Sequence, residues 1–222
     1  MFGIGTAQLR ILSMRFTERD LSRLGTRHLV YGLLMTWAVG IGRYWDHPDP
    51  YLVQSLGLGS LVVMCGLVLV LYGLLLPLRP ARWSLVHLLT FASMTALPAA
   101  LYAIPVEQFL SLEDARTVNV WFLGVVAIWR VALLGRYLSQ WTDLSGVILA
   151  AALLLPLALV VIGLTMLNLE QAVFDVMSGL HEEGTASDTA YLYLVILSAV
   201  SFWASPVLAL IYAFAIWTRR KT

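Results

Sequence analysis

The clearest chemistry-bearing residue of this chain is an arginine inside a long apolar run. Arg130 lies in the segment Val118–Leu138, 11 residues after Asn119. That spacing is close to three turns of an α-helix, so both side chains occupy one helix face. An arginine within a membrane span is costly and marks a ligand path or a buried pairing. We therefore predict two alternatives: Arg130 pairs or snorkels structurally, or it binds a small anionic ligand on the face shared with Asn119.

A second set of polar residues falls at the ends of apolar segments on one side of the predicted bundle. It comprises Arg43, Asp46, His47, Glu107, Asn168 and Glu170. Where those ends converge, they would form an outward-facing polar pocket with mixed charge. The carboxylates and the imidazole suit a divalent metal, although their spacing matches no local metal motif. Interfacial capping and loop salt bridges are the alternative, so the identity of any metal or cofactor stays open.

Motifs typical of enzymes are missing from the sequence. It has no Gly-x-Ser-x-Gly, no His-Glu-x-x-His and no P-loop. The single cysteine, Cys65, excludes a disulfide framework and a cysteine-rich metal site. These absences favour a role other than catalysis.

Composition places the chain in a membrane. Hydrophobic residues make up 60% and charged residues 12%, against about 25% charge in a soluble domain. The net charge of +1 leaves no basic surface of the size that nucleic acid needs. Six segments reach the length of a transmembrane helix, and the sequence predicts an all-α, polytopic bundle. They are Thr26–Trp45, Tyr51–Leu76, Trp83–Ile104, Val118–Leu138, Leu144–Leu167 and Thr189–Thr218.

The charges separate across these spans. On one side lie 11 of the 14 basic residues, and on the other lie 10 of the 13 acidic ones. The positive-inside rule then predicts that the protein lies in the inner or plasma membrane of a cell with both termini on the cytoplasmic side. Termini on the same side require an even number of spans. The chain is thereby divided into a basic cytoplasmic arm (residues 1–25), a transmembrane domain (26–218) and a short tail (219–222). We expect the arm to form an amphipathic helix against anionic headgroups, with binding of a protein partner as the alternative.

Short internal matches indicate a 3+3 inverted repeat, a pattern of transporters. Gly42-Arg43-Tyr44 resembles Gly135-Arg136-Tyr137, and Ser93 with Pro98 resembles Ser201 with Pro206.

Glycines at a spacing of seven residues mark one helix. Gly59, Gly66 and Gly73 predict a seam of close helix packing along the second span.

Three functions are open at this point. The first is a small transporter or a subunit of a membrane transport system with a polar site near the outer face. The second is a membrane scaffold or assembly partner in a protein complex, and the third is a membrane-embedded enzyme with an outward-facing polar site. The expected partners are the lipid bilayer and either a small anionic substrate or another membrane protein, and not nucleic acid.

Overall fold

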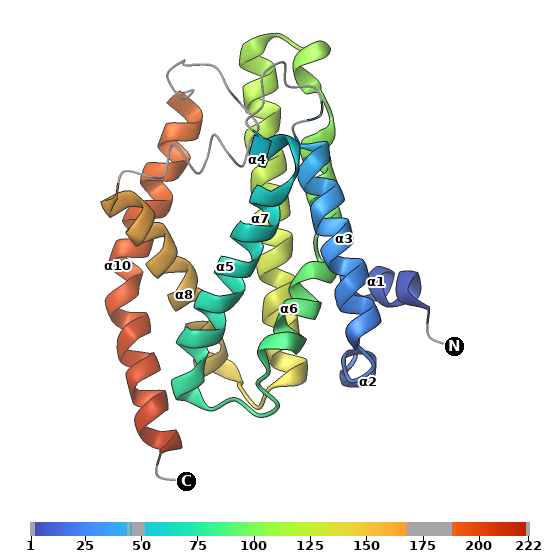
Figure 1. Ribbon diagram of the computed structural model, residues 1–222. Coiled ribbons are helices and arrows are strands. Elements are labelled where there is room, and N and C mark those ends of the chain that lie inside the picture. The colour runs from blue at the N-terminus through green and yellow to red at the C-terminus, as the bar shows by residue number, and fades with distance from the viewer. Residues whose placement is uncertain (1–2, 44, 46–51, 168–187, 221–222) are drawn as a thin grey trace.

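The computed structural model describes residues 3–43, 45, 52–167 and 188–220, and every regular element in them is a helix (Figure 1). This confirms the predicted all-α class. The elements are α1 (Ile4–Leu12), α2 (Glu18–Leu21), α3 (Thr26–Gly42), α4 (Leu52–Ser55), α5 (Leu58–Leu75), η1 (Leu76–Leu78), α6 (Leu85–Met94), η2 (Leu97–Ala103), η3 (Val106–Gln108), α7 (Leu112–Trp141), α8 (Gly146–Met166) and α10 (Asp188–Arg219).

Four helical stretches are long and apolar enough to cross a membrane. They are Leu58–Leu78, Thr117–Trp141, Gly146–Met166 and Val195–Arg219. A fifth span results if α6 and η2 act together, since these two helices meet at a bend of 46°. The protein is therefore embedded in a membrane, and the described residues contain four to five candidate spans where the sequence predicted six. One difference is the bent α6–η2 pair, and the other is α3, which has 17 residues and ends at Gly42 rather than at Trp45.

The largest apolar core lies at the end of the bundle where the α5–α6 and α7–α8 loops turn, at the bottom of Figure 1. Phe16, Leu21, Leu78 and Tyr137 are fully buried there. Two of these residues come from the N-terminal arm, so the arm packs its apolar side against the bundle. We call this the basic end, because Arg79, Arg82 and Arg219 lie on it.

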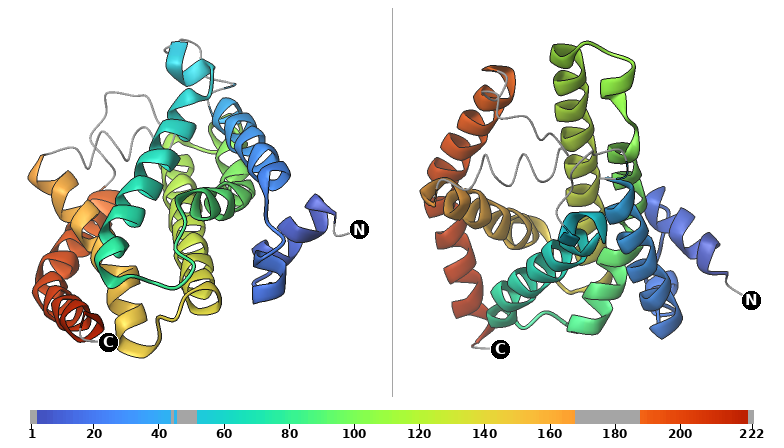
Figure 2. Two further views of the ribbon diagram at one scale, coloured as in Figure 1. Left: turned by 60° about the horizontal axis from the view of Figure 1, so that its bottom comes forward. Right: turned by 45° about the horizontal axis from the view of Figure 1, so that its top comes forward.

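Helices α8 and α10 pair at one side of the molecule, and both views of Figure 2 show α3 on the opposite side. Thr165 of α8 and Ser198 of α10 join through their hydroxyl groups at 2.9 Å. The outward face of α10 exposes large apolar side chains, with Trp203 79% exposed. A surface of this kind fits contact with lipid acyl chains.

Glycines let α3 approach its neighbours closely. A Cβ on Gly32 would lie 2.3 Å from Ser93 Oγ of α6, and a Cβ on Gly40 would lie 2.5 Å from the Gly57 carbonyl oxygen. Gly57 itself has φ +67°, a left-handed conformation that favours glycine. Glycines therefore allow α3 to pack closely against α6 and against the chain around Gly57.

The predicted glycine seam on α5 is wrong. A Cβ on Gly59, Gly66 or Gly73 would meet no atom of the described chain within 4 Å. The buried residues of α5 are Met64, Val68 and Leu75. At 100° per residue these two sets fall on opposite sides of the helix, so the glycines face outward.

Candidate functional site

The break between α6 and η2 is the irregular point of a candidate span. Pro98 has no N–H, so it cannot donate to the Met94 carbonyl four residues earlier. The Ala99 N–H bonds to the Ala96 carbonyl at 3.0 Å, and therefore not to that of Thr95. Two backbone acceptors, those of Met94 and Thr95, are thus left without their helical donors inside an apolar bundle.

Side chains from two other elements occupy these acceptors. Gln8 of α1 donates through Nε2 to the Met94 oxygen at 3.4 Å. Arg130 of α7 donates through Nε to the Thr95 oxygen at 3.3 Å. Non-helical backbone at membrane depth is stable only when the protein itself satisfies it, and these two bonds do so.

Two residues of the predicted outer half lie within electrostatic reach of Arg130. They are Tyr102 in η2 and Arg43 at the end of α3, and the Arg130 side chain itself is half-buried. The Arg43 guanidinium carbon stands 4.8 Å from the centre of the Tyr102 ring, a cation–π distance. We call Arg43, Tyr102 and Arg130 the two-arginine site.

The donor groups of this site suit an anion with oxygen atoms. Guanidinium forks bind carboxylates and phosphates through paired hydrogen bonds, and a phenol hydroxyl adds one donor. Across the part of the chain that the structure describes, no carboxylate pairs with Arg130. Sequence reasoning found both arginines but did not place Tyr102 among the site candidates.

Asn119 is buried at 5% exposure on α7. Eleven residues of helix place it about 16 Å along the axis from Arg130. The two residues share a helix face, as the spacing predicts, but they do not belong to one contact group.

Most of the predicted outer cluster cannot be placed. Asp46, His47, Asn168 and Glu170 lie outside the described residues, as does the side chain of Glu107. Among the residues that are described, no group of three His, Cys, Asp or Glu side chains could hold a metal ion. Arg43 is the one member of this cluster that the structure brings to a defined position.

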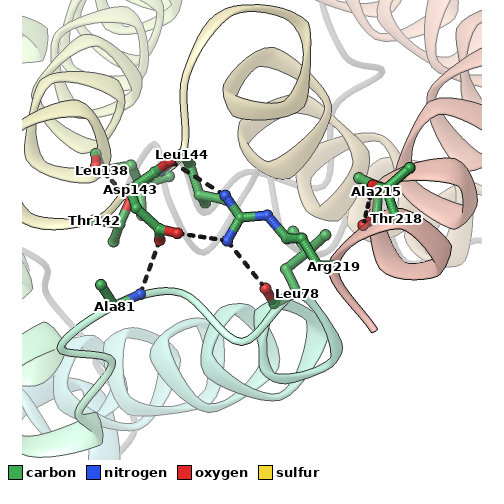
Figure 3. A network of polar contacts seen from close by, with 9 residues as sticks. All are labelled: Leu78, Ala81, Leu138, Thr142, Asp143, Leu144, Ala215, Thr218 and Arg219. Carbon is green, nitrogen blue, oxygen red and sulfur yellow. Dashed lines mark hydrogen bonds and ion pairs between the residues drawn. The ribbon is translucent and has the colours of Figure 1, made fainter. Parts of the chain in front are cut away.

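A polar network that the sequence reasoning missed ties the basic end together (Figure 3). Asp143, in the α7–α8 loop, accepts from the Ala81 N–H at 2.9 Å and from Arg219 Nη1 at 2.8 Å. Arg219 also donates to the carbonyl oxygens of Asp143 at 3.2 Å and Leu78 at 3.4 Å. Partial burial raises the pKa of Asp143, but the bonds from Ala81 and Arg219 outweigh it and hold that pKa below its ordinary value.

The other two acids predicted on the cytoplasmic side are paired as well. Asp20 bonds to Arg10 at 2.9 Å, and Glu18 bonds to Arg82. Burial acts to raise the pKa of Asp20, yet hydrogen bonds from Thr17 and the charge of Arg10 lower it overall. Each acid of this side therefore neutralises one arginine, which local spacing alone could not predict.

Comparison with known proteins adds no relative: no protein-family model, no curated protein and no solved structure matches the chain. The geometry of the two-arginine site is therefore the basis for inferring a function.

Proposed function

We propose that the protein is a small transporter, or a membrane subunit of a transport system, whose substrate is a small anion with oxygen atoms. One observation carries this proposal. Arg130 stands inside a candidate span beside a broken helix, where it donates to the Thr95 carbonyl and has Tyr102 and Arg43 within electrostatic reach. An arginine at the centre of a span costs about 2.5–3.5 kcal/mol. A bound anion would offset that cost, and the Arg130 guanidinium would then serve to bind the substrate.

The proposal includes six spans, with α3 as the sixth. Its 17 residues are about 26 Å long, and its close approach to α6 at Gly32 and Ser93 keeps it within the bundle. An even count keeps both termini in the cytoplasm, in accordance with the charge separation, and agrees with an inner or plasma membrane.

The 3+3 inverted repeat stays a proposal from the sequence matches. The matched helices differ in shape, because the third breaks before Pro98 whereas α10 continues through Pro206. Discontinuous helices at the midplane are the place where transporters bind substrate. The break beside Arg130 is therefore the position at which we place the anion.

Uptake into proteoliposomes tests this function with radiolabelled phosphate, sulfate and acetate as probes. We expect wild type to take up at least one of these anions above protein-free liposomes, and Arg130→Gln to lose at least about 90% of that uptake, because a substrate-binding hydrogen-bonded charge is worth about 1.5–3 kcal/mol. Arg130→Lys should retain part of it. Arg220→Gln, an exposed arginine of the basic end, serves as the matched control. Uptake by Arg130→Gln at the wild-type rate would refute the proposed role.

A scaffold function has one observation in its favour. Arg15, Arg19 and Arg23 of the arm are exposed, and so is Arg27 in the first turn of α3. Exposed basic residues of this kind suit an acidic partner or anionic headgroups. A stoichiometric partner captured from native lipid, and lost when residues 1–25 are deleted, would favour the scaffold over the transporter.

A further inference from the structure

We infer that the N-terminal arm belongs to the transport machinery, because Gln8 positions the helix break that holds Arg130. The residues that position the break and Arg130 are Gln8, Tyr31 and Trp129. The inference rests on the proposed function for its transport consequence, while its structural consequence stands independently.

The bonds around the break form a closed ring through three elements. Gln8 connects α1 to the Met94 carbonyl of α6, and Arg130 connects α7 to the adjacent Thr95 carbonyl. Trp129, next to Arg130, donates through Nε1 to the Leu12 carbonyl at the end of α1, at 3.0 Å. The arm, the break and α7 are therefore fixed against one another, each by two partners.

The orientation of the Gln8 amide follows from its partners. The Met94 carbonyl can only accept, so the amide nitrogen faces it. The amide oxygen is left to accept from the Tyr31 hydroxyl of α3, at 2.7 Å. Gln8 is buried at 4% exposure, so water does not replace these partners.

The rest of the arm is attached by bonds from bundle side chains to arm carbonyls. Arg136 donates through Nη2 to the Phe16 oxygen at 3.3 Å. His87 lies 3.0 Å from the Leu21 oxygen through Nε2 and 2.8 Å from the Tyr137 hydroxyl through Nδ1. Because the Leu21 carbonyl only accepts, Nε2 carries the proton and Tyr137 donates to Nδ1. These bonds fix the arm whether or not Gln8 is present, so a change at Gln8 acts on the break rather than on folding of the arm.

Loss of the Gln8 amide leaves the Met94 carbonyl buried without a donor. A buried backbone acceptor in that state is costly, and the break must move to find a partner. Movement there displaces the neighbouring Thr95 carbonyl, and with it the Arg130 side chain. We therefore expect a lower affinity for the anion in a protein that still folds.

The first experiment measures the break without reference to transport. In a Cys65→Ala background, a single cysteine is introduced by Ala96→Cys at the break, where the side chain is 1% exposed. Gln8→Leu should speed its reaction with N-ethylmaleimide in nanodiscs about fivefold or more, as expected when an unpaired buried carbonyl shifts a local equilibrium. Thr6→Ala, an exposed residue of the same helix, should leave the rate unchanged. An unchanged rate in Gln8→Leu would overturn the inference.

The second experiment connects the break to transport. Gln8→Leu should raise the KM for anion uptake about fivefold or more while the maximal rate changes less, because Arg130 is displaced but still present. Tyr31→Phe should give a smaller shift in the same direction, and Thr6→Ala none. A fall in maximal rate with unchanged KM would contradict a positioning role. If no anion is taken up by wild type while the labelling rate still rises in Gln8→Leu, the proposed function fails and the structural inference stands.

Discussion

At the scale of single residues, the two arginines of the candidate site are accommodated in different ways. Arg43 stacks on the Tyr102 ring, and Arg130 donates to a carbonyl that the helix break leaves open. The Nε of Arg130 is engaged, so its two terminal nitrogens are the edge that we expect to meet an anion.

Replacing a glycine by alanine should affect stability differently on a helix face that packs against a neighbour and on one that does not. Gly32→Ala should destabilise the protein by about 1–3 kcal/mol, because its Cβ would overlap Ser93 and force the helices apart. Gly66→Ala should be neutral or stabilising by up to about 1 kcal/mol, since its Cβ meets open space and alanine favours a helix. Thermal unfolding in one detergent compares the two variants. Equal losses would mean that α5, not only α3, packs through its glycines.

Asp143 makes stability depend on acidity. Its folded-state pKa is lowered, so its contribution is fully present above the unfolded-state value of about 3.9 and is lost as pH falls through the folded-state pKa. Half of its side chain is exposed, so the pair contributes at most about 1 kcal/mol. Asp143→Asn should melt earlier than wild type at pH 7, and the two melting temperatures should converge as the pH falls through the lowered folded-state pKa of Asp143, below its unfolded-state value. Ser139→Ala, an exposed neighbour, is the control, and a difference that persists at low pH would contradict the assignment.

At the scale of elements, the α6–η2 pair is the informative unit. Proline removes one N–H, the chain bends by 46°, and two carbonyls turn to other helices. The bend is thus a consequence of one residue and is stabilised by two others that are distant in sequence.

Pro98→Ala should uncouple the break from the arm. The new N–H at position 98 can donate to the Met94 carbonyl, so the Gln8 amide becomes redundant. Gln8→Leu should then cost less in the Pro98→Ala background than in wild type, by at least about 0.5 kcal/mol. A double-mutant cycle of thermal stabilities measures this coupling. Strictly additive losses would show that Gln8 and Pro98 act separately.

At the scale of the whole molecule, the span count decides the topology. With α3 as a sixth span, the arm and the C-terminal tail lie on the same side of the membrane; without it they lie on opposite sides. In a Cys65→Ala background, single cysteines from Ser13→Cys and Arg220→Cys should react only with permeant maleimide in intact cells, and one from Ser111→Cys should also react with impermeant reagent. All three substituted residues are exposed. Labelling of Ser13→Cys from outside would remove α3 from the list of spans.

Prediction from sequence succeeded where the relevant property is local. The apolar runs became helices, and Arg43 and Arg130 were both identified as site candidates. It failed for Gly59, Gly66 and Gly73, because spacing shows that glycines share a face but not whether a neighbour covers that face. It did not find Gln8, whose partners lie 23 and 86 residues away and whose polar side chain looks ordinary in a basic arm.

The sequence by itself determined that the chain is a helical membrane protein, because transfer of apolar side chains into lipid adds up along each segment whatever the neighbours are. It also named Arg43 and Arg130 as site candidates, but not Gln8 or Tyr102. Only the tertiary structure decided that Arg130 meets the Thr95 carbonyl, 35 residues away, and that the arm packs on the bundle. Such contacts depend on where a helix breaks and on which carbonyl groups lose their helical donors at the break. A hydrogen bond between residues far apart in the sequence produces no periodic sequence pattern from which it could be predicted.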